Sequence, residues 1–190
     1  MIVQAGDDWS LGEVQSLCVK AARGAGRAVG LAEDAGRAAR WLHARGQDGT
    51  GALARLLQAT DGLPVSKLVP RLPDFSPAHE GICPLVLGGY LSDMGTLPSG
   101  PIGPVWSPEL LQPLLANLSA SGVDVVFPPS VHEPVTARMM PRMTMLNPSQ
   151  SRAEVSPETM DALLVFAART YAPATAQSRA GAGSALSDND

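Results

Sequence analysis

The chain has few aromatic residues and little charge of either sign. Its 190 residues include three tryptophans, two tyrosines and three phenylalanines, and 17% of the residues are charged whereas 45% are hydrophobic. This apolar fraction excludes a wholly disordered protein. The formal net charge of −4 gives no sign of the basic surface that nucleic-acid binding requires. We therefore expect a globular protein with an aliphatic core that does not bind nucleic acid.

Cysteine and long hydrophobic runs are also scarce. Cys18 and Cys83 lie far apart, and neither has a second thiol or a histidine at metal-ligand spacing, which argues against a disulfide and against a metal site. No stretch reaches the roughly 18 apolar residues that span a bilayer, and the first residues lack the pattern of a secretory signal. These absences predict a cytoplasmic protein without a membrane segment.

The N-terminal part is predicted to be helical. Ser10 and Glu13 form a capping-box pattern that predicts a helix start. A second helix is expected over 31–45, ending at Gly46, and Asp48 or Thr50 is placed to cap a third. Small residues on the facing sides of the first two helices predict a tight hairpin.

The second part is predicted to contain a small sheet. The apolar run 82–87 predicts a buried strand followed by a tight turn at Gly88-Gly89, and the alternative, which periodicity alone does not exclude, is a helix fragment. Further strands are expected over 123–127, 135–139 and 142–146, the last two joined in a hairpin around Met140-Pro141.

Two Ser-Pro-Glu patterns predict further helix starts. The first begins at Ser107 and is interrupted by Pro113, so that its helix is expected to be kinked or to begin late. The second begins at Ser156, and its helix is expected to turn these residues inward: Met160, Leu163, Leu164, Ala167, Ala168 and Tyr171.

The fold class is predicted to be α+β, with an N-terminal helical hairpin and third helix followed by a small sheet with two packing helices. The length fits a single domain over 1–172, divided into a helical part, 10–60, and a sheet-containing part, 80–172. Residues 173–190 are rich in Gly, Ala and Ser with an acidic end, and predict a tail.

The first candidate site is the segment Arg45-Gly46-x-Asp48-x-x-Gly51. It resembles the end of the N-terminal helices in the malate/L-lactate dehydrogenase family that lacks a Rossmann domain, where the pattern continues Asp-Ser-His-Gly. The resemblance implies that Thr50 stands where that family has its catalytic acid/base histidine. A threonine hydroxyl does not titrate near neutral pH, so this role is not carried over. Arg45, Asp48 and Thr50 are candidate ligand-binding residues, and the alternative is a helix stop, an Asp cap and a restart.

The chain as a whole more closely resembles an uncharacterised bacterial family known only as a domain of unknown function. Three segments carry this likeness, namely 21–36, 83–93 and 173–190. The resemblance implies no reaction and no catalytic residues.

Two further candidate sites follow from local composition. Gly88 and Gly89 with Ser92 and Asp93 follow the predicted strand, where ligand groups are often found. Cys83 with His79 or His132 as base would supply a nucleophile there, although the apolar surroundings of Cys83 favour a core thiol. In the tail, Arg179, Asp188 and Asp190 are placed to bind a ligand, a divalent cation or a second subunit, the alternative being a frayed acidic end.

These observations predict a cytoplasmic homodimer or homo-oligomer that binds a small molecule or a partner protein and performs no chemistry, with no cofactor identified. The alternative is a diverged enzyme, either oxidoreductase-like through Asp48 and Thr50 or metal-assisted through the acidic tail. A structural subunit is a third hypothesis, and it would require a broad exposed apolar face.

Overall fold

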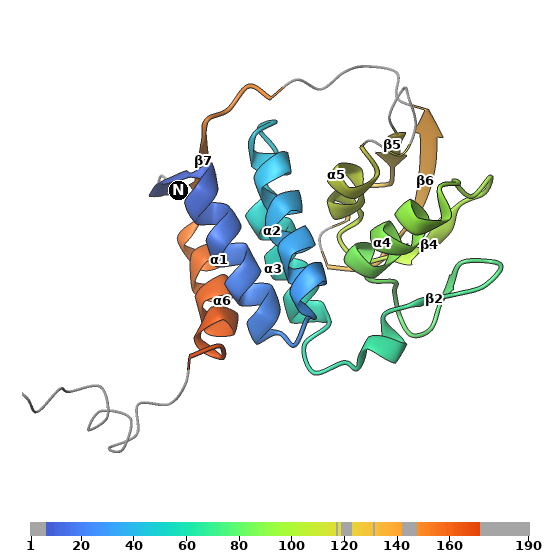
Figure 1. The fold of residues 1–190 in the computed structure, drawn as a ribbon, viewed down its shortest axis with the longest axis horizontal. Helices are drawn as coiled ribbons and strands as arrows, with labels where there is room; N and C mark the ends of the chain where they lie inside the picture. The colour runs from blue at the N-terminus through green and yellow to red at the C-terminus, as the bar shows by residue number, and fades with distance from the viewer. Residues whose placement is uncertain (1–6, 117, 119–122, 131, 142–147, 172–190) are drawn as a thin grey trace, which may run out of the picture.

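The computed structural model describes residues 7–116, 118, 123–130, 132–141 and 148–171, and within them the fold is α+β, as predicted (Figure 1). The helices are α1 (Leu11–Gly24), α2 (Val29–His43), α3 (Gly49–Ala59), α4 (Pro84–Met94), α5 (Leu111–Leu115) and α6 (Pro157–Ala168). Two 3-10 turns, η1 (Val65–Lys67) and η2 (Pro108–Leu110), precede α4 and α5. None of the described helices has the length and apolar character needed to cross a membrane.

The strands form three small antiparallel sheets. β1 (Asp7–Ser10) pairs with β7 (Arg152–Val155), and β2 (Pro70–Arg71) pairs with β3 (Ser76–Pro77). The third sheet has the order β4-β6-β5, from β4 (Ile102–Val105), β6 (Val135–Pro141) and β5 (Val123–Val126). The β1–β7 pair joins the two ends of the described chain, and a helix follows each of its strands.

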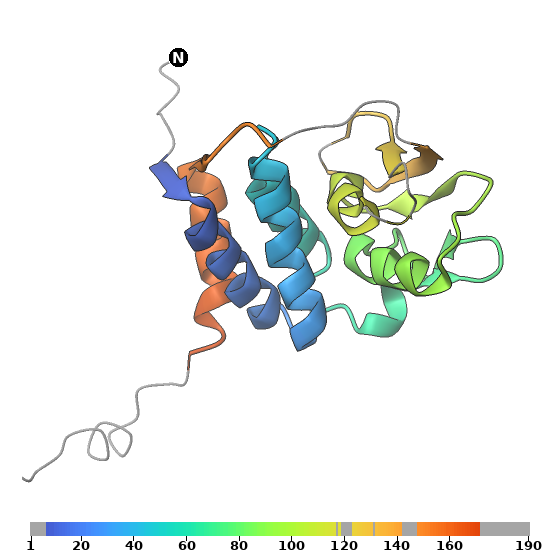
Figure 2. The same ribbon diagram turned by 45° about the horizontal axis from the view of Figure 1, so that its top comes forward.

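Helices α1, α2, α3 and α6 lie together in one half of the molecule, whereas α4 and α5 lie with the β4-β6-β5 sheet in the other (Figures 1 and 2). The predicted tight hairpin of α1 and α2 is confirmed: a Cβ at Gly36 would lie 2.5 Å from Val19 Cγ2. The second half has its own apolar cluster, formed by Ile82, Leu87, Leu91, Ile102, Val105, Leu111, Leu115, Val123 and Ala137.

The predicted helix starts are confirmed where a side chain caps the helix. Ser10 and Glu13 form the complete capping box of α1, Asp48 accepts a hydrogen bond from Gly51 N, and Ser156 accepts one from Thr159 N. Each cap satisfies backbone donors that the first turn leaves unpaired, and it does so within four residues of sequence. This locality explains why these starts were predictable.

The predicted strand over 82–87 is wrong, and the helical alternative is correct from Pro84 onward, where the chain forms helix α4. Pro84 occupies the first turn, where its missing N–H costs nothing. Leu85, Leu87 and Leu91 are all fully buried, so the helix is covered on more than one side and its apolar residues show no single period. Gly88 is therefore not a turn residue; a Cβ there would lie 2.5 Å from Leu114 Cδ1, and the glycine lets α4 approach α5.

Three smaller expectations are also corrected. There is no turn at Met140-Pro141, since β6 continues to Pro141 and pairs there with Val123; the strand expected over 142–146 lies outside the described residues. Ser107 makes no side-chain cap and has a φ of 39°, and η2 and α5 follow it. On α6, Ala168 and Leu164 are exposed instead of inward-facing, and so is Tyr171 beyond the end of the helix; the exposed fractions of Leu164 and Tyr171 are 48% and 64%.

A polar pocket at the junction of α2 and α3

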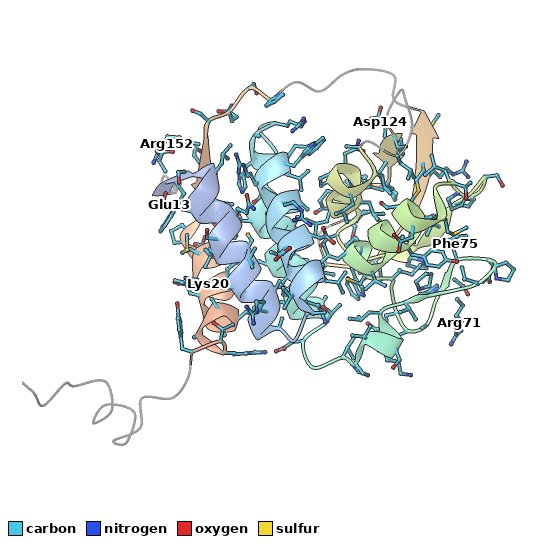
Figure 3. The ribbon with its side chains drawn as sticks, in the orientation of Figure 1. Glu13, Lys20, Arg71, Phe75, Asp124 and Arg152 are labelled. Atoms are coloured by element: carbon cyan, nitrogen blue, oxygen red, sulfur yellow. The ribbon has the colours of Figure 1, made fainter. Side chains whose placement is uncertain are left out.

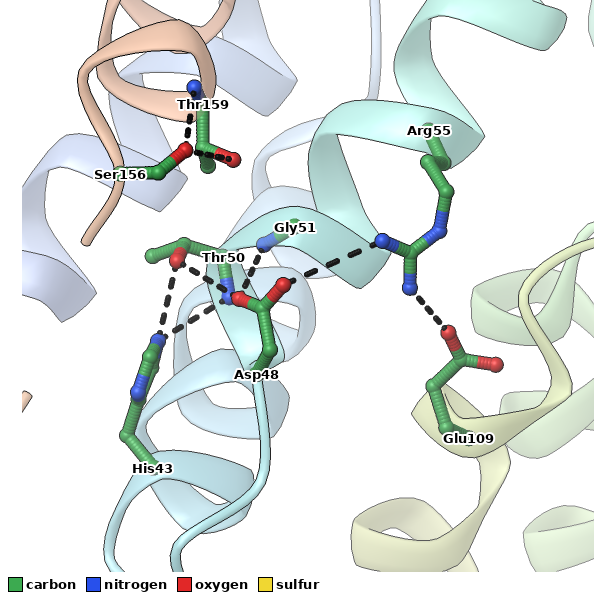
Figure 4. A network of polar contacts seen from close by, with 8 residues as sticks. All are labelled: His43, Asp48, Thr50, Gly51, Arg55, Glu109, Ser156 and Thr159. Atoms are coloured by element: carbon green, nitrogen blue, oxygen red, sulfur yellow. Dashed lines mark hydrogen bonds and ion pairs between the residues drawn. The ribbon is translucent and has the colours of Figure 1, made fainter. Parts of the chain in front are cut away.

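The start of α3 uses two side chains as caps. Gly51 N donates to Asp48 Oδ1 at 2.7 Å, and Thr50 N donates to His43 Nε2 at 3.2 Å (Figure 4). Gly49 N is satisfied by Gln47 O at 2.9 Å. The three backbone donors of the first turn are therefore all paired, one of them by a histidine from the preceding helix.

The glycines of this segment have structural roles. Gly46 ends α2 with a φ of 71°, a conformation that favours glycine. A Cβ at Gly49 would lie 2.3 Å from the backbone oxygen of Ala39, and one at Gly51 would lie 1.9 Å from Asp48 Oδ2. The pattern that resembles a dehydrogenase motif is thus accounted for, at these positions, by a close helix-helix turn.

His43 is buried and held as a neutral ring. Because Nε2 accepts the Thr50 N–H, the proton of the neutral imidazole is on Nδ1. Burial lowers the pKa of His43, and the nearby Asp48 carboxylate opposes this effect. Thr50 is fully buried, and its hydroxyl lies 3.0 Å from His43 Nε2 and 3.2 Å from Asp48 Oδ1. A substrate therefore has no path to the Thr50 hydroxyl in this conformation.

The other side of His43 opens into a pocket of about 320 Å³, which we call the junction pocket. His43 Nδ1 has no hydrogen-bond partner in the described part of the chain, and it is not among the atoms sealed from solvent. Its N–H is therefore available to the pocket. The polar residues around it are His43, Gln47, Asp48, Gln150, Arg152 and Glu154.

The charges around the junction pocket are unequal. Arg152 is bound to Asp8, through Nε to the carboxylate and through NH2 to the backbone oxygen at 2.7 Å. The side chain of Glu154 is exposed, and within the described residues it has no ion pair or hydrogen bond. With Asp48 it gives the pocket two carboxylates against one guanidinium. Arg152 is paired with Asp8, and Asp48 Oδ2 lies 3.9 Å from Arg55 NH1, so Glu154 is the charged side chain of the pocket that has no partner in the described residues. The pocket is therefore suited to neutral or cationic molecules.

A second pocket adjoins the first through an ion pair. Arg55 donates from NH2 to Glu109 Oε1 at 2.8 Å, and its NH1 lies 3.9 Å from Asp48 Oδ2 (Figure 4). Arg55 also lines a pocket of about 270 Å³ next to Trp106 and Ser107. This ion pair thus links Asp48, which lines the junction pocket, to Arg55, which lines the second pocket.

The other predicted site residues lie elsewhere. Arg45 stacks on Trp41, with its guanidinium carbon 3.6 Å from the ring centroid. Gly88, Gly89, Ser92 and Asp93 are on α4 and line neither pocket, and Arg179, Asp188 and Asp190 lie outside the described residues. Among the candidates in the described part of the chain, Asp48 and Thr50 meet at the start of α3, and the four α4 residues lie apart from them.

Neither cysteine is available as a nucleophile. Cys18 and Cys83 are fully buried, and burial raises the pKa of both thiols, that of Cys18 to about 12. His79 and His132, the two alternative bases predicted for Cys83, are both exposed. The described residues include no group of three His, Cys, Asp or Glu side chains arranged to hold a metal ion.

Comparison with known families gives a match, which includes the residues that cap α3. Residues 9–77 match the family described as "Protein of unknown function (DUF3726)". The match covers a little over a third of the chain and includes His43, Asp48 and Arg55, but not Arg152 or Glu154. It confirms, over these residues, the resemblance to a family of unknown function. No curated protein and no solved structure matches the chain.

Sequence reasoning missed His43 and Glu154 as site residues. The available signal for His43 was its position five residues before the Asp48 cap, close enough for one turn to join them. For Glu154 there was no local signal, since it reaches the pocket through the pairing of β7 with β1.

Proposed function

We propose that this protein binds a small, hydroxyl- or amine-bearing molecule in the junction pocket and performs no covalent chemistry on it. The observation that carries the proposal is the His43 Nδ1–H, which is left without a partner when Nε2 caps α3 and which is open to the pocket. A buried polar group with one free donor is a usual element of ligand specificity.

The charges support a neutral or cationic ligand. Glu154 offers a free carboxylate to a hydroxyl or an ammonium group, and Asp48 Oδ2 adds a second acceptor. His43 Nδ1–H is complementary to an oxygen of the same ligand. A dianionic ligand would face two carboxylates and a guanidinium already held by Asp8, so anions should be rejected.

The polar groups around the α3 start are already engaged in capping. Asp48 Oδ1 accepts from Gly51 N, His43 Nε2 accepts from Thr50 N, and Thr50 is buried. A general base must reach a substrate proton with a free lone pair, and the neutral His43 presents a proton there instead. The oxidoreductase-like alternative remains a prediction without support from this geometry.

The test is a thermal-shift screen followed by calorimetric titration. Polyols, amino alcohols and amines represent the favoured classes, and dicarboxylates and nucleotides represent the excluded ones. Binding to the native state raises its stability, so a ligand should raise the melting temperature in proportion to its saturation. We expect shifts only with the first group.

Two variants locate the site. Glu154→Gln removes the free carboxylate of the pocket and should weaken an amine ligand by about tenfold, the effect of losing one charge-assisted hydrogen bond. Glu33→Gln is the control, since Glu33 is exposed on α2 outside the pocket. Binding of dicarboxylates in place of amines, equal weakening by both variants, or no shift with any compound would each contradict the proposal.

A further inference from the structure

Helices α1 and α6 run in the same direction at one edge of the molecule (Figures 1 and 2). Both begin at the β1–β7 pair, and both start with a serine cap. At their far ends they are in close contact, since a Cβ at Gly24 would lie 1.8 Å from the backbone oxygen of Phe166. The starts of the two helices therefore lie at one end of this edge, and their last turns lie at the other.

Helix α6 is more apolar than its packing explains. From Leu163 to Ala168 every residue is apolar, but only Leu163, Phe166 and Ala167 are buried. Leu164 and Val165 are exposed by 48% and 61%. A helix that is hydrophobic on all sides is normally buried on all sides, so part of its surface has no cover in the described chain.

A groove of about 550 Å³ lies between α1 and α6. Its apolar walls come from Trp9, Leu17, Leu164 and Tyr171. Its floor is open along α1, where a Cβ at Gly12 would meet only Ser10 Oγ, at 4.0 Å. A helix ridge from another molecule would therefore find both apolar walls and room to enter.

The groove is acidic at one end and basic at the other. Glu13 lines it near the start of α1 and Lys20 near the end, and Figure 3 shows both on the outer side of the helix. On α6, Glu158 and Asp161 lie toward the start. Arg169 follows the last turn but is held by Asp61 through hydrogen bonds of 2.7 and 2.9 Å, so Lys20 supplies the positive charge at the basic end of the groove. A face with this charge order is complementary to itself when a second copy is turned end to end.

We propose that the α1–α6 face is the interface of a homodimer with twofold symmetry. In this arrangement Leu164 packs into the groove of the second copy, and Lys20 faces Glu13 of the partner subunit, twice by symmetry. The helix dipoles of the two copies are antiparallel as well, which favours the same orientation. The charge order selects a second copy of this chain over an unrelated partner, because the same face supplies both halves of each pair.

Sedimentation velocity over a concentration series tests the apolar contact. The full-length protein should show a reversible monomer–dimer equilibrium. Leu164→Glu, in the groove, should raise the dissociation constant by at least about tenfold, because it buries a charge against apolar walls. Val29→Glu is the matched control: Val29 is an exposed apolar residue at the start of α2, outside the groove, and the substitution should leave the equilibrium unchanged.

Charge variants test the end-to-end orientation. Lys20→Glu places two carboxylates opposite each other at both ends of the interface and should weaken the dimer by about tenfold at low salt, more than Lys20→Gln. Adding Glu13→Gln, which keeps a capping-box side chain, should restore part of the affinity. The proposal is overturned if the protein is monomeric at all concentrations, whether its own terminal residues or nothing covers this face. It is also overturned if the protein forms a dimer that neither Leu164→Glu nor Lys20→Glu weakens.

Discussion

The capping role of His43 gives a quantitative prediction for protein stability. Replacing His43 with leucine keeps an apolar side chain of similar size but removes the Nε2 acceptor, so the Thr50 N–H is left buried without a partner. An unpaired buried donor costs about 1–3 kcal/mol. His43→Gln places an amide oxygen near the position of Nε2 and should cost less than about 1 kcal/mol. Urea unfolding monitored by circular dichroism measures both values.

The same residue predicts a pH dependence. Burial lowers the pKa of His43 below its ordinary value of 6.5, so the unfolded chain binds this proton more readily than the folded one. The free energy of unfolding should therefore fall as the pH is lowered through 6.5, by at most about 1.4 kcal/mol per pH unit for one group. Protonation of Nε2 would also place an N–H against the Thr50 N–H, which is the structural cause of the loss.

The carboxylates do not obscure this effect. Hydrogen bonds from Ser10, Arg169 and the start of α6 lower the pKa values of Glu13, Asp61 and Glu158 respectively, and the ordinary values of these groups are 4.5 or below. Their contribution is lost only at more acidic pH, so the interval from 5 to 6.5 reports on His43. In His43→Gln the slope over this interval should be reduced. Equal destabilisation by the leucine and glutamine variants, or an unchanged slope in His43→Gln, would refute the capping argument.

Further predictions concern the glycines and the thiols. Gly49→Ala should destabilise the protein by at least about 2 kcal/mol, because its Cβ would overlap the α2 backbone. Gly30 has open space around it, so Gly30→Ala should stabilise the protein by up to about 1 kcal/mol through helix propensity. Urea unfolding measures both changes in the free energy of unfolding. Gly51→Ala should displace the Asp48 cap and cost about 1 kcal/mol or more. Burial raises the pKa of Cys18 and Cys83, so stability should fall as the pH rises above 9, and both thiols should react with a disulfide reagent only after unfolding; reaction in the native state would contradict their burial.

The parts of the fold that could be predicted from the sequence are those whose stabilising contacts join residues close together in the chain. The starts of α1, α3 and α6 were predicted because a cap and the donor it satisfies lie within four residues. The first part of helix α4 was predicted as a strand. The helix is buried on several sides, and a helix buried in this way lacks the 3.6-residue hydrophobic period by which helices are recognised in a sequence. The outward direction of Leu164 was missed for the opposite reason, since an apolar side chain predicts burial but does not say against what.

Some residues of the candidate site could be predicted and others could not, again because sequence patterns report only local contacts. Asp48 and Thr50 were found because they belong to one local motif, and His43 lay one turn away from them. Arg152 and Glu154 come from a strand more than a hundred residues further on, and nothing near them in the sequence indicates a pocket. A site assembled by the return of the chain to its own start cannot be read from spacing.

Because the Arg45–Gly51 segment resembles a catalytic motif, residues that stabilise the start of α3 must be distinguished from residues that bind a ligand. Asp48 caps α3 and Gly51 makes room for that cap, so variants at either position should alter stability together with any ligand affinity. The side chain of Glu154 has no hydrogen-bond or ion-pair partner among the described residues, so Glu154→Gln should alter ligand affinity alone. The start of α3 explains the motif without any reaction. A variant that lowers ligand affinity and leaves the free energy of unfolding unchanged is therefore the evidence that would assign a functional role to this pocket.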